Sequence, residues 1–398
     1  MVASVLQLQN KGEQDAYLTA TPSINMFKYK YHQYINFATE LVRLQPNELF
    51  DFGKTSSCTI PLKGDLLSKL YLRIKVPKLT RTSGTYLSWS DTLGYAIFKE
   101  GIDLEISGVV VDTFYPGYYD IHDSFEKPDN DLGANLGILR SDTYISSKFN
   151  AEADNDMIIP LRFWFTRNYK MSLPIIAMPN QNMSVKFKLR NFQDCINYDG
   201  LPPIDSNIIE SEILVEYIYI DDSAKTLFKD SSHTFLIEQV KYNGKEQISE
   251  NSGIYHAKLQ FNNPCKELMF ACVEKTSNDN NNYYNYSKII DNTPLISEIS
   301  LVLDGKNRFD FLPEVMNRLG YAASIHKSVP LKYVYTLPFC IKPYDNQPSG
   351  TLNLSKFDDV TLVLKMSKNN PICFLHVYAL MYNVLTIQQG IMTLKFMS

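Results

Sequence analysis

Tryptophan, cysteine and long apolar runs are all scarce in this chain of 398 residues, which has 2 Trp and 6 Cys. No two cysteines stand in a C-x-x-C spacing, so the sequence indicates buried free thiols in a reducing compartment rather than a zinc site or a disulfide framework. No stretch approaches 18 consecutive apolar residues, and the N-terminus lacks a basic region ahead of an apolar one. We therefore expect a soluble protein made in a cytosol, without a membrane span or a secretory signal.

Positive charge is also in short supply, because the formal net charge is −4 and the pI is near 5.9. A protein that coats nucleic acid normally carries a basic surplus or a clustered basic patch. No run of Lys and Arg in the sequence is long enough to form such a patch. Direct binding of nucleic acid is therefore not expected.

Motifs for catalysis, cofactors and metals are missing as well. Gly53-Lys54-Thr55 matches the end of a phosphate-binding loop, but position 48 is Glu where that loop needs Gly. Asp103 and Glu105 share one face of a predicted strand, where two carboxylates are usually the solvated side. The six histidines have no metal-ligand spacing, and His376 lies in an apolar strand where a hydrogen-bonded core residue is expected. The sequence thus predicts no catalytic, metal-binding or cofactor-binding residues.

Aromatic residues that favour strands are abundant, with 26 Tyr and 22 Phe. Apolar and polar residues alternate with period two in many short runs, which is typical of half-buried strands. Helical patterns are few, and we expect only two short helices, at 36–44 and 313–319. Strands are predicted, among others, at 70–76, 102–106, 185–190, 213–220, 360–366 and 374–382. Many short strands between Gly, Pro, Asn and Asp clusters favour an all-β protein of sandwiches or jelly rolls.

The chain divides near Asp221, where the strand ending at Ile220 gives way to a polar, turn-rich stretch at 221–233. Each part is shorter than 230 residues and is large enough for an eight-stranded jelly roll. Two long excursions, Asp112 to Asp156 and Glu274 to Thr293, are predicted to be loops. Loops of this length usually have a function, so both are candidate contact surfaces.

The most specific local pattern is QPSGTLNLSKFD, at 347–358. Pro348 fixes its own φ angle and withholds a donor, and Gly350 permits positive φ, so the pattern predicts a turn between strands. Ser349 is interpreted as a turn former rather than a nucleophile. This stretch therefore favours an architectural role.

Seven segments, in order along the chain, resemble blocks of the major capsid proteins of nucleocytoplasmic large DNA viruses. They include QDAYLTATPSINMFKYKYHQYINFATE near the N-terminus, with its Tyr–His–x–x–x–Asn-Phe-Ala pattern, and IIPLRFWFTRNYKMSLPIIAM, with its Pro-Leu-x-Phe-Trp-Phe block. The resemblance runs from about Gln14 to the C-terminus. The seven segments lie at 14–40, 52–77, 158–178, 233–244, 259–270, 303–311 and 347–358.

This resemblance implies an all-β fold of two consecutive eight-stranded antiparallel jelly rolls with a few short helices. The expected organisation is an N-terminal arm at 1–24, a first jelly roll at 25–220 and a second at 221–398. It further implies a structural, non-enzymatic capsid protein of the virion, synthesised and assembled in the host cytoplasm. Homotrimers would form pseudo-hexagonal capsomers of an icosahedral shell.

The partners implied by the resemblance are neighbouring capsomers, penton proteins, minor capsid (cement) proteins and an inner viral membrane. Loops 112–156 and 274–293 are candidate contacts for a host receptor. Two alternatives remain open from the sequence. One is a scaffold or minor capsid paralogue of the same fold, and the other is a jelly-roll surface protein that binds a receptor or glycans.

Overall fold

The computed structural model describes residues 3–9, 12–126 and 153–396 of the chain. The chain forms two compact units, Met1–Asn36 and Phe37–Ser398. In the first unit, α1 (Ala3–Gln9) and α2 (Glu13–Thr19) are two short helices. Large apolar side chains of this unit are exposed, among them Tyr17 and Phe27. Within the described ranges, no helix has the length and apolarity needed to cross a bilayer.

The first half of the second unit is built from two four-stranded antiparallel sheets and one small two-stranded sheet. The first sheet has the order β1 (Phe37–Leu44), β10 (Glu210–Ile220), β3 (Leu66–Val76), β7 (Asn155–Pro160). The second has the order β2 (Thr55–Ile60), β8 (Met183–Lys188), β5 (Ile102–Ile106), β6 (Val109–Phe114). The small sheet pairs β4 (Leu87–Trp89) with β9 (Ile196–Tyr198), and the short helical elements are α3 (Leu93–Ala96), η1 (Trp164–Thr166), η2 (Tyr169–Met171), η3 (Ile175–Ala177) and η4 (Phe192–Cys195).

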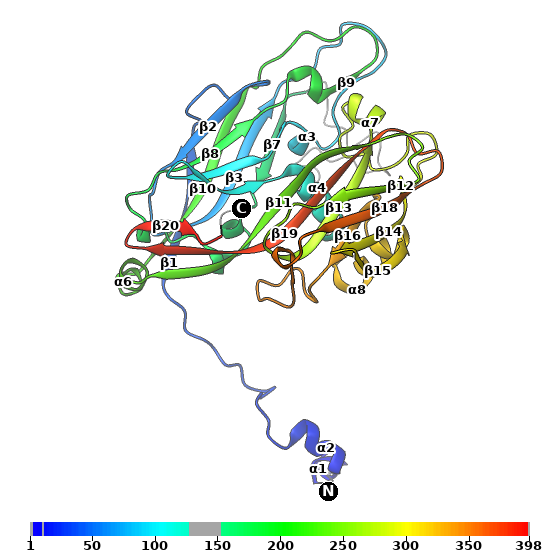
Figure 1. The fold of residues 1–398 in the computed structure, drawn as a ribbon. Helices are drawn as coiled ribbons and strands as arrows, with labels where there is room; N and C mark the ends of the chain where they lie inside the picture. The colour runs from blue at the N-terminus through cyan, green and yellow to red at the C-terminus, as the bar shows by residue number, and fades with distance from the viewer. Residues whose placement is uncertain (1–2, 10–11, 127–152, 397–398) are drawn as a thin grey trace. The chain divides into compact units, whose positions relative to one another are not determined.

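The second half repeats this plan with its own two sheets. One has the order β11 (His233–Ile248), β19 (Cys373–Gln388), β13 (Pro264–Glu274), β16 (Val334–Pro338), with β17 (Leu352–Asn353) added to β13 and β20 (Ile391–Leu394) added to β19. The other has the order β12 (Ile254–Lys258), β18 (Val360–Met366), β14 (Ile296–Leu303), β15 (Lys306–Pro313). The helical elements are α7 (Lys275–Asp279), η5 (Met316–Gly320), α8 (Tyr321–Ile325) and η6 (Leu354–Lys356). In Figure 1, the strands of the first half (blue to green) lie beside those of the second (green to red).

Strand order identifies each half as a jelly roll. Leaving out the short β4, β9, β17 and β20, the eight main strands of each half follow the order 1-8-3-6 in one sheet and 2-7-4-5 in the other. This arrangement results when a long antiparallel hairpin is folded over itself, so that sequence neighbours often lie in opposite sheets. The same order occurs twice in one chain, and the predicted fold class is confirmed.

The apolar core does not stop at the junction between the halves. One cluster fills the first half and continues into the second through Ile237, Val240 and Met269. A separate cluster lies wholly within the second half. Because buried apolar surface is the main stabilising contribution to folding, the shared cluster makes the two jelly rolls one rigid unit.

The strands predicted from alternation are all present, but the predicted helix at 36–44 is wrong. These residues form β1, whose partners on β10 run from Phe37 opposite Ile220 to Leu44 opposite Ile213. Tertiary pairing with a long strand outweighs a weak local helix preference. The helix predicted at 313–319 exists but begins one residue later, because Pro313 ends β15 and helical turns run from Glu314 to Ile325.

The polar stretch near Asp221 is more ordered than predicted. It contains α6 (Asp222–Asp230), and the Asp221 side chain caps this helix by accepting a hydrogen bond from the backbone N–H of Ala224 at 3.0 Å. In each sheet of the second unit, all strands come either from before α6 in the sequence or from after it.

The turn at 347–358 forms as the sequence predicts. Gly350 has a φ of +133°, and the Ser349 hydroxyl accepts a hydrogen bond from the backbone N–H of Lys342 at 2.9 Å. The next residues, Leu352 and Asn353, extend the main sheet of the second half by pairing with Cys265 and Pro264. The Asn353 side chain then accepts from the backbone N–H of Ser355, which opens η6.

Candidate functional site: the seam between the two jelly rolls

Helix α4 (Pro116–Glu126) lies at the seam between the two jelly rolls. Figure 1 shows it between the strands of the first half and β13, and it contacts both α3 and β13. Proline at its first position is compatible with helix geometry, because that residue needs no intrahelical donor. This finding corrects the predicted loop at 112–156: residues 112–114 end β6, residues 116–126 form a largely buried helix, and 127–152 lie outside the described residues.

Asp120 of α4 connects the first half to the second. Its carboxylate, with the side chain 3% exposed, accepts from Lys332 Nζ at 2.8 Å and from the Tyr286 hydroxyl at 2.8 Å. Both partners belong to the second half. A buried carboxylate is tolerated only when it is paired and hydrogen-bonded, as this one is.

Asp123, one turn later on α4, has its partners within the first half. Arg162 donates to both of its oxygens, at 2.5 and 2.7 Å, and the Tyr95 hydroxyl donates to it at 2.9 Å. Burial alone would raise the pKa of this carboxyl, but the charge of Arg162 outweighs burial and holds the pKa well below its usual range. Asp123 therefore anchors α4 to the first jelly roll as an ionised group.

A second ionic connection crosses the seam at Glu238 of β11. One carboxylate oxygen of Glu238 lies 3.2 Å from Arg167 of the first half, and the other lies 2.5 Å from Nζ of Lys266 on β13. The Lys266 side chain is only 1% exposed. Its other acceptor is the carbonyl of Asp345, at 2.9 Å. Glu238 is therefore the carboxylate that neutralises a lysine buried beside the seam.

The predicted loop 274–293 is also part of this seam. The Asn281 amide donates to the carbonyls of Gln193 and Ile196, and the Tyr283 hydroxyl donates to the carbonyl of Asp194. All three acceptors belong to the first half. Residues 281–286 thus help to hold the two jelly rolls together.

The structure gives the residues weighed in the sequence ordinary structural contacts. Asp103 and Glu105 share a face of β5, but Asp103 accepts from the Thr113 hydroxyl at 2.7 Å and Glu105 pairs with Lys186 at 2.6 Å. Gly53 (φ +71°) lies in a turn that leads into strand β2, without a phosphate-binding helix. His376 is hydrogen-bonded, as predicted, through Nδ1 to the Tyr242 hydroxyl at 2.7 Å.

All six cysteines are free and buried, which confirms the prediction for them. Burial raises the pKa of the Cys58 thiol to about 11 and that of the Cys195 thiol to about 12. Since the thiolate is the reactive form, these two side chains act as small apolar residues.

The structure brings together one cluster with metal-binding atoms that sequence spacing did not indicate. Ligand atoms of His122, Asp123 and Glu126 lie within 4.8 Å of one another on α4. However, Arg162 occupies both oxygens of Asp123, and Lys327 lies 3.0 Å from Glu126. These cations already neutralise the carboxylates, so the cluster is explained as part of the seam's ion-pair network.

Asp112, at the end of β6, carries an unusual pKa. Its oxygens accept from the backbone N–H groups of Thr113 and Trp164 at 3.0 and 3.2 Å, yet burial raises the pKa to about 7. The folded protein therefore binds this proton more tightly than the unfolded chain does, whose value is near 3.8. The stability contributed by this group falls as the pH rises from about 4 to about 7.

We expect the Asp112→Asn variant to lose this pH dependence. Thermal unfolding midpoints of the natural protein and the variant should be compared at pH 5, 6, 7 and 8, and the variant should gain relative to the natural protein as the pH rises toward 7. Asp199→Asn is the control, because hydrogen bonds from Thr85 and Tyr86 lower the pKa of exposed Asp199 to about 2. A difference between the Asp112 variant and the natural protein that stays constant from pH 5 to 8 would contradict the titration.

Comparison with solved structures defines the class of protein to which this double jelly roll belongs. A chain from the quasi-atomic model of the PBCV-1 virus capsid superposes with a TM-score of 0.81, at 21% identity, covering 94% of this chain and 100% of that one. The Faustovirus major capsid protein superposes with a TM-score of 0.75, at 13% identity, covering 97% of each chain. The fold is thus that of viral double jelly-roll capsid proteins.

Sequence comparison narrows the class to a family. Residues 25–221 match the family described as major capsid protein N-terminus, and residues 225–393 match the large eukaryotic DNA virus major capsid protein family. The major capsid protein of Pyramimonas orientalis virus is 29% identical, and that of Paramecium bursaria Chlorella virus 1 is 26% identical, each over 98% of both chains. The chain belongs to the major capsid proteins of large eukaryotic DNA viruses. It is a structural, non-enzymatic protein of the virion capsid, as the sequence resemblance implied.

Proposed function

We propose that three copies of this chain assemble into a pseudo-hexagonal capsomer that tiles an icosahedral shell. The observation that carries the proposal is the repeated strand order, because one chain then supplies two similar blocks and three chains supply six. A closed ring of three copies is a common solution to oligomer symmetry. The shared apolar cluster and the ion pairs across the seam support it further, since a capsomer requires the two jelly rolls of each chain to keep a fixed orientation.

Within this proposal, the chain is organised as an arm at 1–24 followed by jelly rolls at 25–220 and 221–398. No sheet of the described residues combines strands from before α6 with strands from after it, which supports the boundary between 220 and 221. The first compact unit, Met1–Asn36, contains the proposed arm. The proposed contacts of the assembled capsomer are neighbouring capsomers, penton proteins, minor capsid proteins and an inner viral membrane. Host-receptor contact through 112–156 and 274–293 is proposed as well.

The mass of the purified protein in solution tests the trimer. Light scattering is expected to give three times 45.7 kDa at all working concentrations, and electron microscopy should show a six-lobed outline. The Glu238→Leu variant supplies a comparison. Because it loosens the seam, the six lobes should become less distinct by electron microscopy while the mass remains that of a trimer. A mass of 45.7 kDa across a wide concentration range would refute the proposal.

A further inference from the structure

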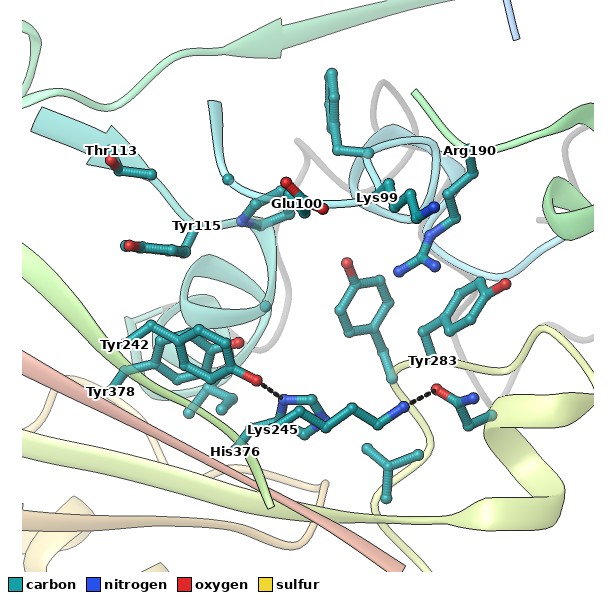
Figure 2. Close-up of a pocket in the computed structure, with 18 of the residues that line it drawn as sticks. Lys99, Glu100, Thr113, Tyr115, Arg190, Tyr242, Lys245, Tyr283, His376 and Tyr378 are labelled. Atoms are coloured by element: carbon teal, nitrogen blue, oxygen red, sulfur yellow. Dashed lines mark hydrogen bonds between the residues drawn. The ribbon is translucent and has the colours of Figure 1, made fainter. Parts of the chain in front are cut away.

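A cavity of about 590 Å³ opens at the seam, on the side of α4 that carries Gly117 and Ile121. The first half contributes Phe98, Tyr115 and Arg190 to its wall, and the second half contributes strands β11 and β19 and the segment 278–286. Figure 2 shows these side chains converging from both halves. The volume lies within the range of about 300–1,000 Å³ that is typical of small-molecule sites.

Tyrosine rings dominate the cavity wall. Six tyrosines line it, and several already stack on neighbours: the rings of Tyr242 and Tyr378 lie 4.8 Å apart at 21°, and Tyr242 lies 5.9 Å from the ring of His376 at 11°. Tyr115 approaches the same pair at 5.8 and 6.1 Å. The six tyrosines are Tyr115, Tyr242, Tyr283, Tyr284, Tyr286 and Tyr378. Such a wall favours a ligand with a planar ring, because aromatic faces and edges attract each other.

Three cations line this wall, Lys99, Arg190 and Lys245, and none of them forms a salt bridge with a carboxylate of the described residues. The guanidinium of Arg190 lies 3.9 Å from the ring centre of Tyr283, and its Nε donates to the carbonyl of Ala96. Nζ of Lys245 lies 3.6 Å from the ring centre of Phe374 and forms a long hydrogen bond of 3.5 Å to the Asn278 amide oxygen. Across residues 3–9, 12–126 and 153–396, no carboxylate oxygen forms a salt bridge with any of the three cations.

The carboxylates near the cavity are engaged elsewhere. Glu100 pairs with Lys188 at 2.6 Å, Asp103 accepts from the Thr113 hydroxyl, and Asp279 pairs with Lys275 at 2.6 Å. Two of these cations also act on one histidine, because burial and then the charges of Lys245 and Arg190 lower the pKa of His376 to about 4. At neutral pH His376 is therefore uncharged, and the positive charge in the cavity comes from Lys99, Arg190 and Lys245.

We propose that this cavity binds a small anion that carries a planar ring, with the anionic group on Arg190 and Lys245 and the ring among the tyrosines. Phosphate or carboxylate groups suit this pair of cations, since charge-assisted hydrogen bonds from Arg are strong and directional. A ligand in this position touches both jelly rolls. Its binding therefore stabilises the seam, because a ligand that binds only the folded state raises the free energy of unfolding.

Calorimetry on the purified full-length protein tests the proposal with three probes: adenosine monophosphate, adenosine and inorganic phosphate. We expect adenosine monophosphate to bind once per chain and to raise the thermal unfolding midpoint. Arg190→Gln and Lys245→Gln should each weaken its binding by about tenfold or more, which corresponds to ~1.4 kcal/mol. The matched control is Arg308→Gln, because Arg308 also lies over an aromatic ring, 4.4 Å from the centre of Phe339, but does not line the cavity.

Each alternative result overturns a stated part of the proposal. No binding of adenosine monophosphate, or equal weakening by all three variants, refutes the cavity as its site. Inorganic phosphate that binds as tightly as the nucleotide refutes recognition of the ring, and adenosine that binds as tightly refutes the role of the cations. Lys245 is exposed, so its variant is expected to fold even if the Arg190 variant does not. Binding is measured per chain, so the result does not depend on whether the protein is a trimer.

Discussion

Replacing Glu238 with leucine is expected to lower the thermal unfolding midpoint by about 5–10 °C. The substitution leaves Lys266, which is 1% exposed, with the Asp345 carbonyl as its remaining acceptor, and removes the carboxylate bound to Arg167. Breaking a buried ion pair by removing one partner typically costs about 3–5 kcal/mol, because the other charge stays buried without compensation. Circular dichroism during heating measures the change.

Two further variants separate burial from charge in this experiment. Glu298→Leu removes a carboxylate that lies 2.5 Å from Lys365, the same separation as in the Glu238–Lys266 pair, but both partners are more than one-third exposed. Surface pairs contribute only about 0–1 kcal/mol, so this control should lower the midpoint by 2 °C or less, roughly. The double variant Glu238→Leu/Lys266→Met should recover much of the loss, because no buried lysine charge remains. Equal losses from Glu238→Leu and Glu298→Leu would show that the seam pair does not stabilise the protein.

Replacing Gly350 with valine is expected to have the second large effect, destabilising the chain by about 3 kcal/mol or more and reducing the yield of folded protein. Gly350 has a φ of +133°, which side-chain-bearing residues rarely adopt. A Cβ at this position would also lie 2.8 Å from the carbonyl oxygen of Phe339 and 3.2 Å from Cα of Cys340. Both neighbours are backbone atoms of the adjoining segment, so they cannot move aside cheaply. Denaturant unfolding measures the loss.

Other glycines make it possible to separate backbone strain from steric overlap. Gly244 also has positive φ (+97°), but no atom lies within 4 Å of a Cβ built there. Gly253 has neither positive φ nor a near neighbour. The expected order of destabilisation is Gly350→Val, then Gly244→Val, then Gly253→Val. If Gly350→Val destabilised the protein no more than Gly253→Val, the turn at 347–358 would be less important than its geometry indicates.

Strand positions were predictable because alternation is a local property. Burial on one face of β3, β5, β8 and β18 requires apolar residues at every second position, and that requirement is visible in the amino-acid order. The helix prediction for residues 36–44 was wrong because their pattern is compatible with both helix and strand, and pairing with β10 favours the strand. The helix α4 was missed because its buried charges, such as Asp120 and Asp123, resemble the composition of a surface loop.

The sequence by itself determined the all-β class, the turn at 347–358, the inert buried cysteines and, through seven ordered segments, the capsid family. These features depend on periodicity, on single-residue backbone preferences and on resemblance, all of which can be read along one chain. Only the tertiary structure decided what holds the two jelly rolls together. Asp120 meets Lys332 across 212 positions, and Arg167 meets Glu238 across 71. Such charges acquire their partners only when folding removes them from water and places the two halves side by side.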